Sequence, residues 1–396
     1  MRAENTPRIS VVVPTRDRPD LLDFCLQSLA AQPFDGAEVI VCDNPTSVPA
    51  QDVFDRHAGE GWRYLRPDTP LEMHDNFEFA CAEANGEFVA VVVDKTVLHP
   101  TALELAVAAI DTEPEADILT WRNEGYIPLD ESGDVGRGLY MPMAQTVEPT
   151  VYDPRAELAR RFANAERRGI DPVHYVRAKI VFGAYSRALL RRIAVESGRV
   201  FYPLAPDYTS MVPACVFART AVDLGRPLLV SYNSARSNGR RQALDPAHAR
   251  RFIGAVDPAI VDALPLPGVY ASHHNVVAYD LVSAAARCPA GATPQLDMPN
   301  LLRRIREDFD EVAWADADER AAQYALLERA EAEQGVEPEA SPAAAKQPRS
   351  LRQLISRAVG TASAAASRSK EEWTTYSSPV EAARAADRYH SQVTLR

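Results

Sequence analysis

The stretch that decides the fold is ISVVVPTRDR, residues 9–18. Residues 9–13 predict a buried strand, and the polar residues after them predict a loop that leads into an amphipathic helix starting near Leu21. Two further apolar strands are expected at residues 38–42 and 88–93. Apolar strands separated by helical segments are typical of an α/β fold, so we expect an open, mostly parallel sheet flanked by helices.

Each of the two later strands is followed by an aspartate. Asp43 comes after residues 38–42, and Asp94 comes after residues 88–93. In an open parallel sheet, ligands bind beyond the carboxyl ends of the strands. We therefore expect Asp43, Asp94 and the loop at Thr15 and Arg16 to line one cleft.

These segments resemble the family 2 glycosyltransferases of the GT-A fold. The likeness rests on VVVPTRDR at residues 11–18, EVIVCDN at residues 38–44, and NGEF at residues 85–88 with the strand that leads to Asp94. It covers the first third of the chain well and the next third loosely. The resemblance implies a GT-A type sheet with a C-terminal helical extension, and a nucleotide-diphosphate sugar as the donor.

The resemblance also implies which residues bind the nucleotide. Pro14, Thr15 and Arg16 would line the base and ribose, and Asp43 would accept a hydrogen bond from a base edge such as the uracil imide. Asn76, on a helix expected near residues 73–79, would help to shape the pocket. The alternative for Asp43 is a simple turn residue before a proline.

A second group of nucleotide contacts is expected from the Gly-containing loop at residues 234–241, which carries three arginines. Arg240 and its neighbours could donate paired hydrogen bonds to diphosphate oxygens. The same composition also suits a solvated loop, so both interpretations stay open.

Asp94-Lys95-Thr96 stands where the resembled family normally carries consecutive aspartates that bind a divalent cation. Manganese or magnesium prefers oxygen ligands, so Asp94 with two phosphate oxygens can still hold such an ion, although more weakly. Alternatively, Lys95 stabilises the departing diphosphate directly as a cation. A third interpretation has Lys95 in solvent and Asp94 capping a helix. His273 or His274 could add a metal ligand.

The candidate catalytic base is Asp207, in the stretch FYPLAPDY at residues 201–208. An inverting transfer needs one general base to remove the proton of the acceptor hydroxyl. The resembled family commonly has a Glu-Asp pair at the start of a helix here, whereas this chain has Pro206 before the aspartate. The alternative role of Asp207 is that of a first-turn acid favoured by the helix dipole.

Composition narrows the class of protein. The chain has 396 residues, 46% of them hydrophobic, and no apolar run approaches the length of a membrane span. The N-terminal residues lack the apolar core of a secretory signal, so we expect a cytoplasmic protein. A net charge of −12 argues against nucleic acid as the main partner. The five cysteines show neither pairing nor zinc-ligand spacing, and we expect them to be buried apolar residues.

We expect four segments along the chain. They are a nucleotide-sugar-binding half at residues 1–120, an acceptor-side half at 121–290, a helical extension at 291–335, and an Ala/Ser/Arg-rich linker with a basic tail at 336–396. Residues 123–150 are predicted to form a loop over the cleft. The pattern Leu351, Leu354, Ile355, Val359 predicts a short amphipathic helix, which could contact an anionic membrane surface peripherally or pack on its own domain.

The sequence as a whole predicts a hexosyltransferase-like enzyme. It would move a sugar from a nucleotide-diphosphate donor to an acceptor hydroxyl by single displacement with inversion. The acceptor can be a glycan, a lipid-linked glycan or a small molecule. The alternative is a non-catalytic GT-A-like module that binds a nucleotide sugar or glycan and acts as a partner protein, because the second aspartate of the metal motif is missing.

Overall fold

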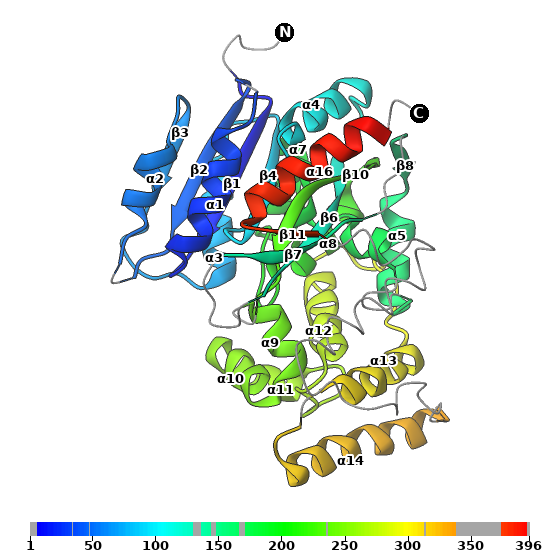
Figure 1. Cartoon of the computed structure of the whole chain (residues 1–396). Helices are drawn as coiled ribbons and strands as arrows, with labels where there is room; N and C mark the ends of the chain where they lie inside the picture. Colours follow the sequence, from blue (N-terminus) through cyan, green and yellow to red (C-terminus); the bar gives the residue numbers. More distant parts are fainter. Residues whose placement is uncertain are drawn as a thin grey trace.

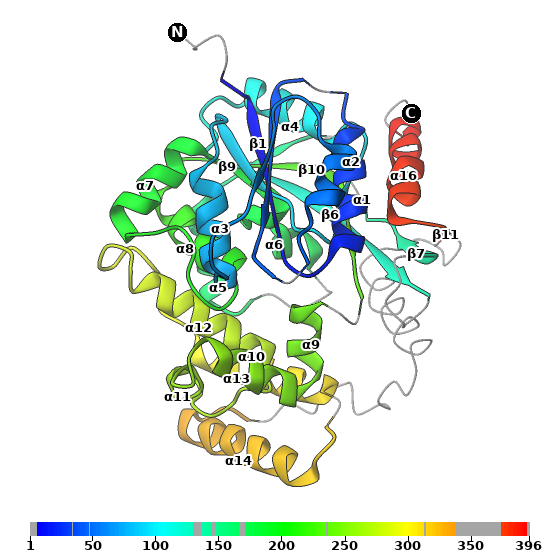
Figure 2. The same cartoon turned by 90° about the vertical axis from the view of Figure 1, so that its left-hand side faces the viewer.

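The computed structural model describes residues 6–33, 35–46, 48–129, 136–143, 148–165, 171–234, 237–312, 314–337 and 374–393. A mixed sheet of eleven strands forms its centre, with helices on both faces (Figures 1 and 2). A group of helices lies below one end of this sheet. The expected α/β class with a flanked central sheet is confirmed.

The N-terminal part of the sheet is parallel, in the order β3-β2-β1-β4. Its strands are β1 (Ile9–Thr15), β2 (Ala37–Asp43), β3 (Trp62–Leu65) and β4 (Phe88–Val91). Their connecting helices are α1 (Pro19–Ala30), α2 (Gln51–His57) and α3 (Met73–Ala82). Thr15 pairs with Asp43 across β1 and β2, and Val12 pairs with Val91 across β1 and β4. The strand ends therefore meet at one edge, as expected.

The rest of the sheet is mixed in direction. Its strands are β5 (Thr96–Leu98), β6 (Ile118–Pro128), β7 (Gly138–Met141), β8 (Thr150–Tyr152), β9 (Gly183–Ser186) and β10 (Ala221–Tyr232). Its helices are α4 (Ala102–Thr112), α5 (Pro154–Phe162), α6 (Pro172–Val176), the 3-10 helix η1 (Ile180–Phe182), α7 (Arg187–Ser197) and α8 (Pro206–Phe217). β9 lies antiparallel between β4 and β6, and β10 runs parallel to β6.

The predicted loop over residues 123–150 is wrong in part, because β6 continues to Pro128, β7 lies inside this range and β8 begins at its last residue. A glycine allows a close strand pairing here. A Cβ on Gly138 would lie 2.2 Å from Cε1 of Tyr126 on the neighbouring strand. Glycine inside a strand is typical of such close approaches.

Alternating side chains of the parallel strands fill two apolar cores, one on each face of the sheet. Val11, Val13 and Val39 belong to one core, whereas Val12 and Ile40 belong to the other. This alternation is the period of two that a strand imposes. Three of the cysteines are buried among these apolar side chains, as expected: Cys25, Cys42 and Cys215.

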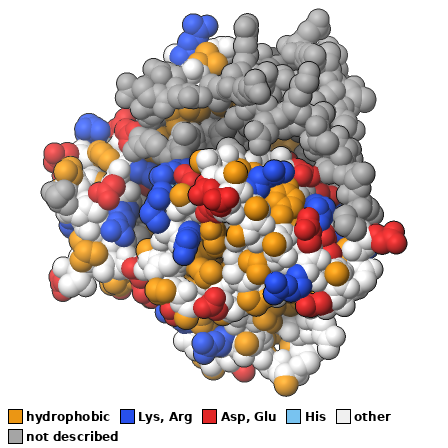
Figure 3. Space-filling model, turned by 90° about the horizontal axis from the view of Figure 1, so that it is seen from below, with side chains coloured by type: hydrophobic (Ala, Val, Ile, Leu, Met, Phe, Trp, Pro, Cys, Tyr) orange, Lys and Arg blue, Asp and Glu red, His pale blue; other side chains and the backbone are white. Residues whose placement is uncertain are grey.

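A helical unit lies below the sheet and has its own apolar core. It contains α9 (Asn238–Leu244), α10 (Pro246–Val256), α11 (Ile260–Ala263), α12 (His273–Ala285), α13 (Met298–Glu311) and α14 (Ala317–Gln334). Helix α12 packs on α8, so the unit reaches the sheet domain through that contact. On the face seen from below, acidic, basic and apolar side chains are interspersed (Figure 3).

The C-terminal residues 374–393 return to the sheet, which corrects the expectation of a linker and basic tail over the whole of residues 336–396. β11 (Thr374–Tyr376) pairs with β7, and α16 (Pro379–Val393) packs on α1, β5 and β10 (Figure 1). Val380, Ala382 and Ala383 are buried there. They give this segment an apolar face, which the basic composition of the tail did not indicate. The predicted amphipathic helix near Leu351 lies outside the described residues.

None of the described helices combines the length and the apolar character that crossing a bilayer requires.

Candidate active site

Asp94 lies in the turn between β4 and β5, and its carboxylate is tied to the connection between β1 and α1. Thr15 Oγ1 donates a 3.0 Å hydrogen bond to Oδ2, and Arg18 Nη1 lies 3.4 Å from Oδ1. The side chain is 5% exposed. Burial raises the pKa of Asp94, whereas Arg18, Thr15 and Lys95 act in the opposite direction.

Lys95 extends from the same turn into the site and not into solvent. Its Nζ donates a 2.9 Å hydrogen bond to Ser237 Oγ, at the start of α9. Burial lowers the pKa of the Lys95 ammonium, and Arg18 lowers it further. Asp94 and Asp207 both raise the pKa of Lys95, so both carboxylates lie within its electrostatic range. Lys95 thereby links two predicted site residues that are far apart in the sequence.

Asp207 lies in the first turn of α8, as predicted, with Pro206 at the first helical position. Its side chain is 24% exposed, so an acceptor can reach it. Its Oδ2 lies 3.7 Å from Nζ of Lys179, a residue that the sequence analysis missed. The only signal for Lys179 in the sequence is a single charge inside an otherwise apolar run at residues 178–184.

The loop before Asp207 is held by Asp280 of α12, a second residue that the sequence analysis missed. The backbone N–H groups of Leu204 and Ala205 donate hydrogen bonds of 2.8 and 2.9 Å to the two oxygens of Asp280. Burial raises the pKa of Asp280 to about 8, and Asp207 adds to the rise, whereas the two backbone bonds oppose it. The helical unit therefore reaches directly into the approach to the candidate base.

The two adjacent histidines at the start of α12 have different surroundings. His274 Nδ1 lies 2.9 Å from Oδ1 of Asp308 on α13. His273 instead places its ring edge-on to Tyr208, with 6.5 Å between the ring centroids. Within the described ranges, no cluster of three or more His, Cys, Asp or Glu side chains could hold a metal ion, so neither histidine joins Asp94 in one.

Asp43 is buried at the end of β2, next to Thr15 in the sheet register. Its Oδ2 accepts hydrogen bonds from Tyr64 Oη at 2.5 Å and from the backbone N–H of Ala50 at 2.9 Å. The Arg66 guanidinium also contacts this oxygen. Sequence reasoning missed Tyr64 and Arg66, which lie at the end of β3 and just after it.

The other predicted nucleotide contacts surround the same strand ends. Pro14 is buried in β1, whereas the Arg16 side chain is 54% exposed. Asn76 of α3 is buried, and its Oδ1 accepts a 3.1 Å hydrogen bond from Cys42 Sγ beneath Asp43. The backbone of Arg240 lies in α9, and its side chain falls outside the described residues.

The residues around Asp94 fit a divalent cation poorly. They offer one carboxylate, whose oxygens already contact Thr15 and Arg18, and the neighbouring side chains Arg18 and Lys95 are themselves cations. Magnesium and manganese favour several oxygen ligands and are repelled by nearby positive charge. The arrangement instead suits an anionic ligand group placed between Lys95 and Arg18.

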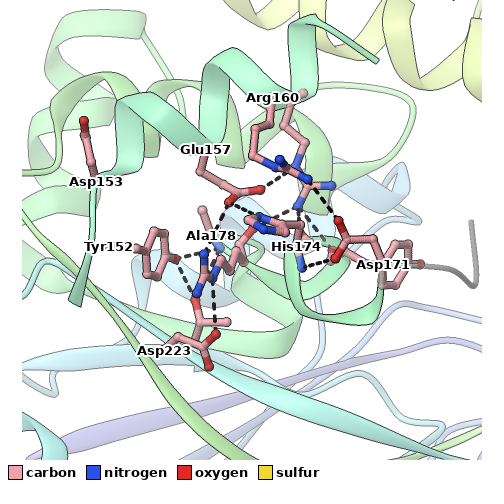
Figure 4. Close-up of polar contacts among 12 residues, drawn as sticks. Tyr152, Asp153, Glu157, Arg160, Asp171, His174, Ala178 and Asp223 are labelled. Atoms are coloured by element: carbon pink, nitrogen blue, oxygen red, sulfur yellow. Dashed lines mark hydrogen bonds and ion pairs between the residues drawn. The ribbon is translucent and has the colours of Figure 1, made fainter. Parts of the chain in front are cut away.

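A buried polar network lies beside this site and joins α5, α6, β6 and β10 (Figure 4). Glu157 of α5 is 2% exposed and contacts His174 Nδ1 at 2.7 Å. Asp223 of β10 is 1% exposed and pairs with Arg122 and Arg177. These ion pairs fix α6 against the sheet, just before Lys179.

Part of the chain is similar to a known protein family. Residues 10–196 match glycosyl transferase family 2. No curated protein sequence matches the chain. Among solved structures, S. aureus TarS 1–349 in complex with UDP-GlcNAc has 16% identity and a TM-score of 0.47, with 83% of this chain and 92% of that chain covered.

A second similar structure is the mannosyltransferase PcManGT from Pyrobaculum calidifontis in complex with GDP-Man and Mn²⁺. It has 17% identity and a TM-score of 0.40, with 83% of this chain and 87% of that chain covered. The segment that matches the family contains β1, β2 and β4 together with Asp43 and Asp94. The chain therefore contains a segment, residues 10–196, that is similar to glycosyl transferase family 2.

Proposed function

We propose that the chain transfers a sugar from a nucleotide-diphosphate sugar to an acceptor hydroxyl, in a hexosyltransferase-like reaction with inversion. The observation that carries this proposal is that Lys95, beside Asp94, is half-buried and bonded to Ser237 at the start of α9, while the Asp207 carboxylate at the start of α8 is partly exposed. A cation for the leaving diphosphate and a reachable carboxylate for the acceptor are the two groups that a single displacement needs.

In the proposed reaction, Asp207 accepts the proton of the acceptor hydroxyl. The acceptor oxygen forms a bond to the anomeric carbon while the bond from that carbon to the diphosphate oxygen breaks. The diphosphate leaves with the electron pair, and attack from the opposite face inverts the anomeric centre. The partial exposure of Asp207 leaves room for an acceptor to approach its carboxylate.

Lys95 and Arg18 supply the positive charge for the diphosphate in this proposal. Lys95 is held by Ser237 and is withdrawn from solvent, where its Coulomb interaction with an anion is stronger than in bulk water.

The donor's base and ribose would lie at the ends of β1 and β2. Asp43 would accept a hydrogen bond from the base, and Pro14, Thr15, Arg16 and Asn76 would shape the pocket around it. Burial of Asp43 among fixed donors gives its carboxylate one orientation, which favours recognition of one base edge. Arg240 would contact the diphosphate from the side of α9.

A second candidate function is a non-catalytic module that binds a nucleotide sugar or glycan. The internal contacts of Asp94 with Thr15 and Arg18 favour it, because a carboxylate satisfied by protein groups has less capacity for a metal or ligand. The reachable Asp207 favours the enzyme instead.

The test of the proposed function is a thermal-shift series with UDP, GDP, dTDP and CMP and their sugars, each with manganese, magnesium or EDTA. A ligand that binds only the folded state raises the melting temperature by mass action. We expect one nucleotide family to raise it, followed by release of that nucleotide when an acceptor is added. Binding without release would support the non-catalytic module, and the absence of any shift would contradict the transferase.

A further inference from the structure

We propose that Lys179 is a positioning residue for the transfer reaction, whose buried ammonium group holds the Asp207 carboxylate in one orientation for proton removal. This inference rests on the proposed function, in which Asp207 is the base. It adds a residue that has no counterpart among the motifs from which the site was predicted.

Lys179 and Asp207 differ in how far their charged groups are exposed to solvent. Nζ of Lys179 lies 3.7 Å from Oδ2 of Asp207, while the Lys179 side chain is 0% exposed and that of Asp207 is 24% exposed. The Lys179 ammonium group is therefore shielded from solvent, whereas part of the Asp207 carboxylate remains accessible to a substrate. An opposite charge at this distance favours the ionised form of a carboxyl group.

Two aromatic rings confine the ammonium group. Nζ of Lys179 lies 3.8 Å from the ring centroid of Tyr175 and 3.7 Å from that of Tyr208. Tyr175 comes from α6, and Tyr208 follows Asp207 directly in α8. A cation between two ring faces is stabilised by their quadrupoles without being neutralised. Lys179 can therefore keep its charge in a site that excludes water.

The backbone that carries Tyr175 and Lys179 is anchored by a single buried guanidinium. Arg161 donates to the carbonyl oxygens of His174, of Tyr175 at 3.3 Å and of Arg177 at 3.2 Å. His174 in turn contacts Glu157, toward which its ring points in Figure 4. These bonds remove the freedom that a loop of this length would otherwise have, so the ammonium group is preorganised.

The backbone just before Lys179 is strained, which supports a functional role for this segment. Ala178 is fully buried with a φ of 59°, a conformation that residues with a Cβ rarely adopt. Its N–H donates a 3.0 Å hydrogen bond to Tyr152 Oη, which holds it there. Strained backbone persists only where the surroundings determine it fully, and it is concentrated at functional sites.

Stability alone does not explain a lysine at this position. Removing an ammonium group from water is costly, and a buried ion pair often stabilises a fold no better than apolar side chains of the same volume. Methionine would fill the space between Tyr175 and Tyr208 with no such cost. The lysine is explained if its charge acts on Asp207.

The variant Lys179→Met tests this by removing the charge and keeping most of the side-chain volume. We expect a decrease in kcat of about tenfold or more, because general-base catalysis depends on an aligned carboxylate. The loss should appear in kcat, since Lys179 acts on the base and not on the donor. The Kd for the donor nucleotide should stay within about twofold of the wild-type value.

Two further variants distinguish loss of the proposed role from unfolding or general destabilisation of the protein. Tyr175→Ala removes one of the two rings that confine Lys179 and should lower kcat by a smaller amount. Arg306→Met is the matched control, because it removes a cation paired with a buried carboxylate, Glu331, in the helical unit. It should leave kcat unchanged.

A double variant separates positioning from general support of the fold. In an Asp207→Asn background, Lys179→Met should cause no further loss of the residual rate, because the carboxylate that it is proposed to position is gone. Equal losses in both backgrounds would overturn the proposal, as would a Lys179→Met effect that appears in the donor Kd and not in kcat. If the wild-type protein transfers no sugar, the proposed function fails and this inference falls with it. Normal transfer with an unaffected Lys179→Met overturns the role of Lys179 alone.

Discussion

The backbone N–H of Leu204 donates a 2.8 Å hydrogen bond to Oδ1 of Asp280, and this bond joins the helical unit to the loop that leads into Asp207. The segment that matches the family ends at residue 196, so Asp207 and Asp280 both lie beyond it. The parallel strands β1, β2 and β4 and the candidate base therefore belong to different parts of the chain. Their alignment depends on the packing of α12 on α8.

The variant Asp280→Asn should disturb this alignment. An asparagine oxygen can accept from Leu204 or Ala205, but its amide group then faces the other N–H and leaves a buried donor unsatisfied. We expect a destabilisation of about 1–3 kcal/mol and a reduced kcat with nearly unchanged donor affinity. Urea unfolding and steady-state kinetics measure both. Asp245→Asn, which exchanges one good helix N-cap for another, is the control and should change neither.

Lys95 should carry the leaving-group stabilisation that a metal normally provides in the family. We expect the wild-type protein to keep most of its turnover in EDTA. Lys95→Met should lose about 100-fold in kcat, the usual effect of removing one group that stabilises developing charge. Ser237→Ala, which removes only the hydrogen-bond partner of Lys95, should have a much smaller effect. Loss of turnover in EDTA together with an active Lys95→Met would identify a metal as the cation instead.

Asp43 should act mainly on donor binding. Asp43→Ala removes the proposed acceptor for the base edge, so the donor Kd should rise by roughly tenfold or more while kcat at saturation changes little. Tyr64→Phe is the matched control because it removes one donor to Asp43 and keeps the carboxylate. It should cost about 1 kcal/mol of stability and leave the donor Kd nearly unchanged. Unaltered affinity in Asp43→Ala would remove Asp43 from the pocket.

Asp308 should make the stability of the helical unit depend on pH. Burial would raise the pKa of Asp308, but His274, with help from His273, holds that pKa well below its usual range. A carboxyl group with a lowered folded-state pKa stabilises the fold above its unfolded pKa of about 4 and loses that contribution as the pH falls further. The stability gap between wild type and Asp308→Asn in urea unfolding should therefore be larger at pH 5 than at pH 3. A gap independent of pH would contradict this account of the pKa.

The N-terminal, parallel part of the sheet was predictable because its signals are local. The buried runs of β1, β2 and β4 determine the strand pattern, and parallel pairing then brings Asp43 and Asp94 to one edge. The helix that carries Asn76 followed from its own sequence as well. No knowledge of distant contacts was needed for any of these.

The remaining site residues were not predictable because their roles come from tertiary contacts. Lys179 and Asp280 are single charges in apolar surroundings, and only the packing of α6, α8 and α12 shows which groups they meet. The packing of α16 on the sheet could not be predicted for the same reason. Its apolar face becomes visible only when α1 and β10 are beside it.

The central claim is that Asp207 is the base of a nucleotide-sugar transferase. The most direct measurement is nucleotide release from the donor identified by thermal shift, with acceptor present, for the wild-type protein and for Asp207→Asn. We predict release by the wild type, a loss of about 100-fold or more in Asp207→Asn, and the same donor Kd for both proteins. Release at the wild-type rate by Asp207→Asn, or none by the wild type, would contradict the account.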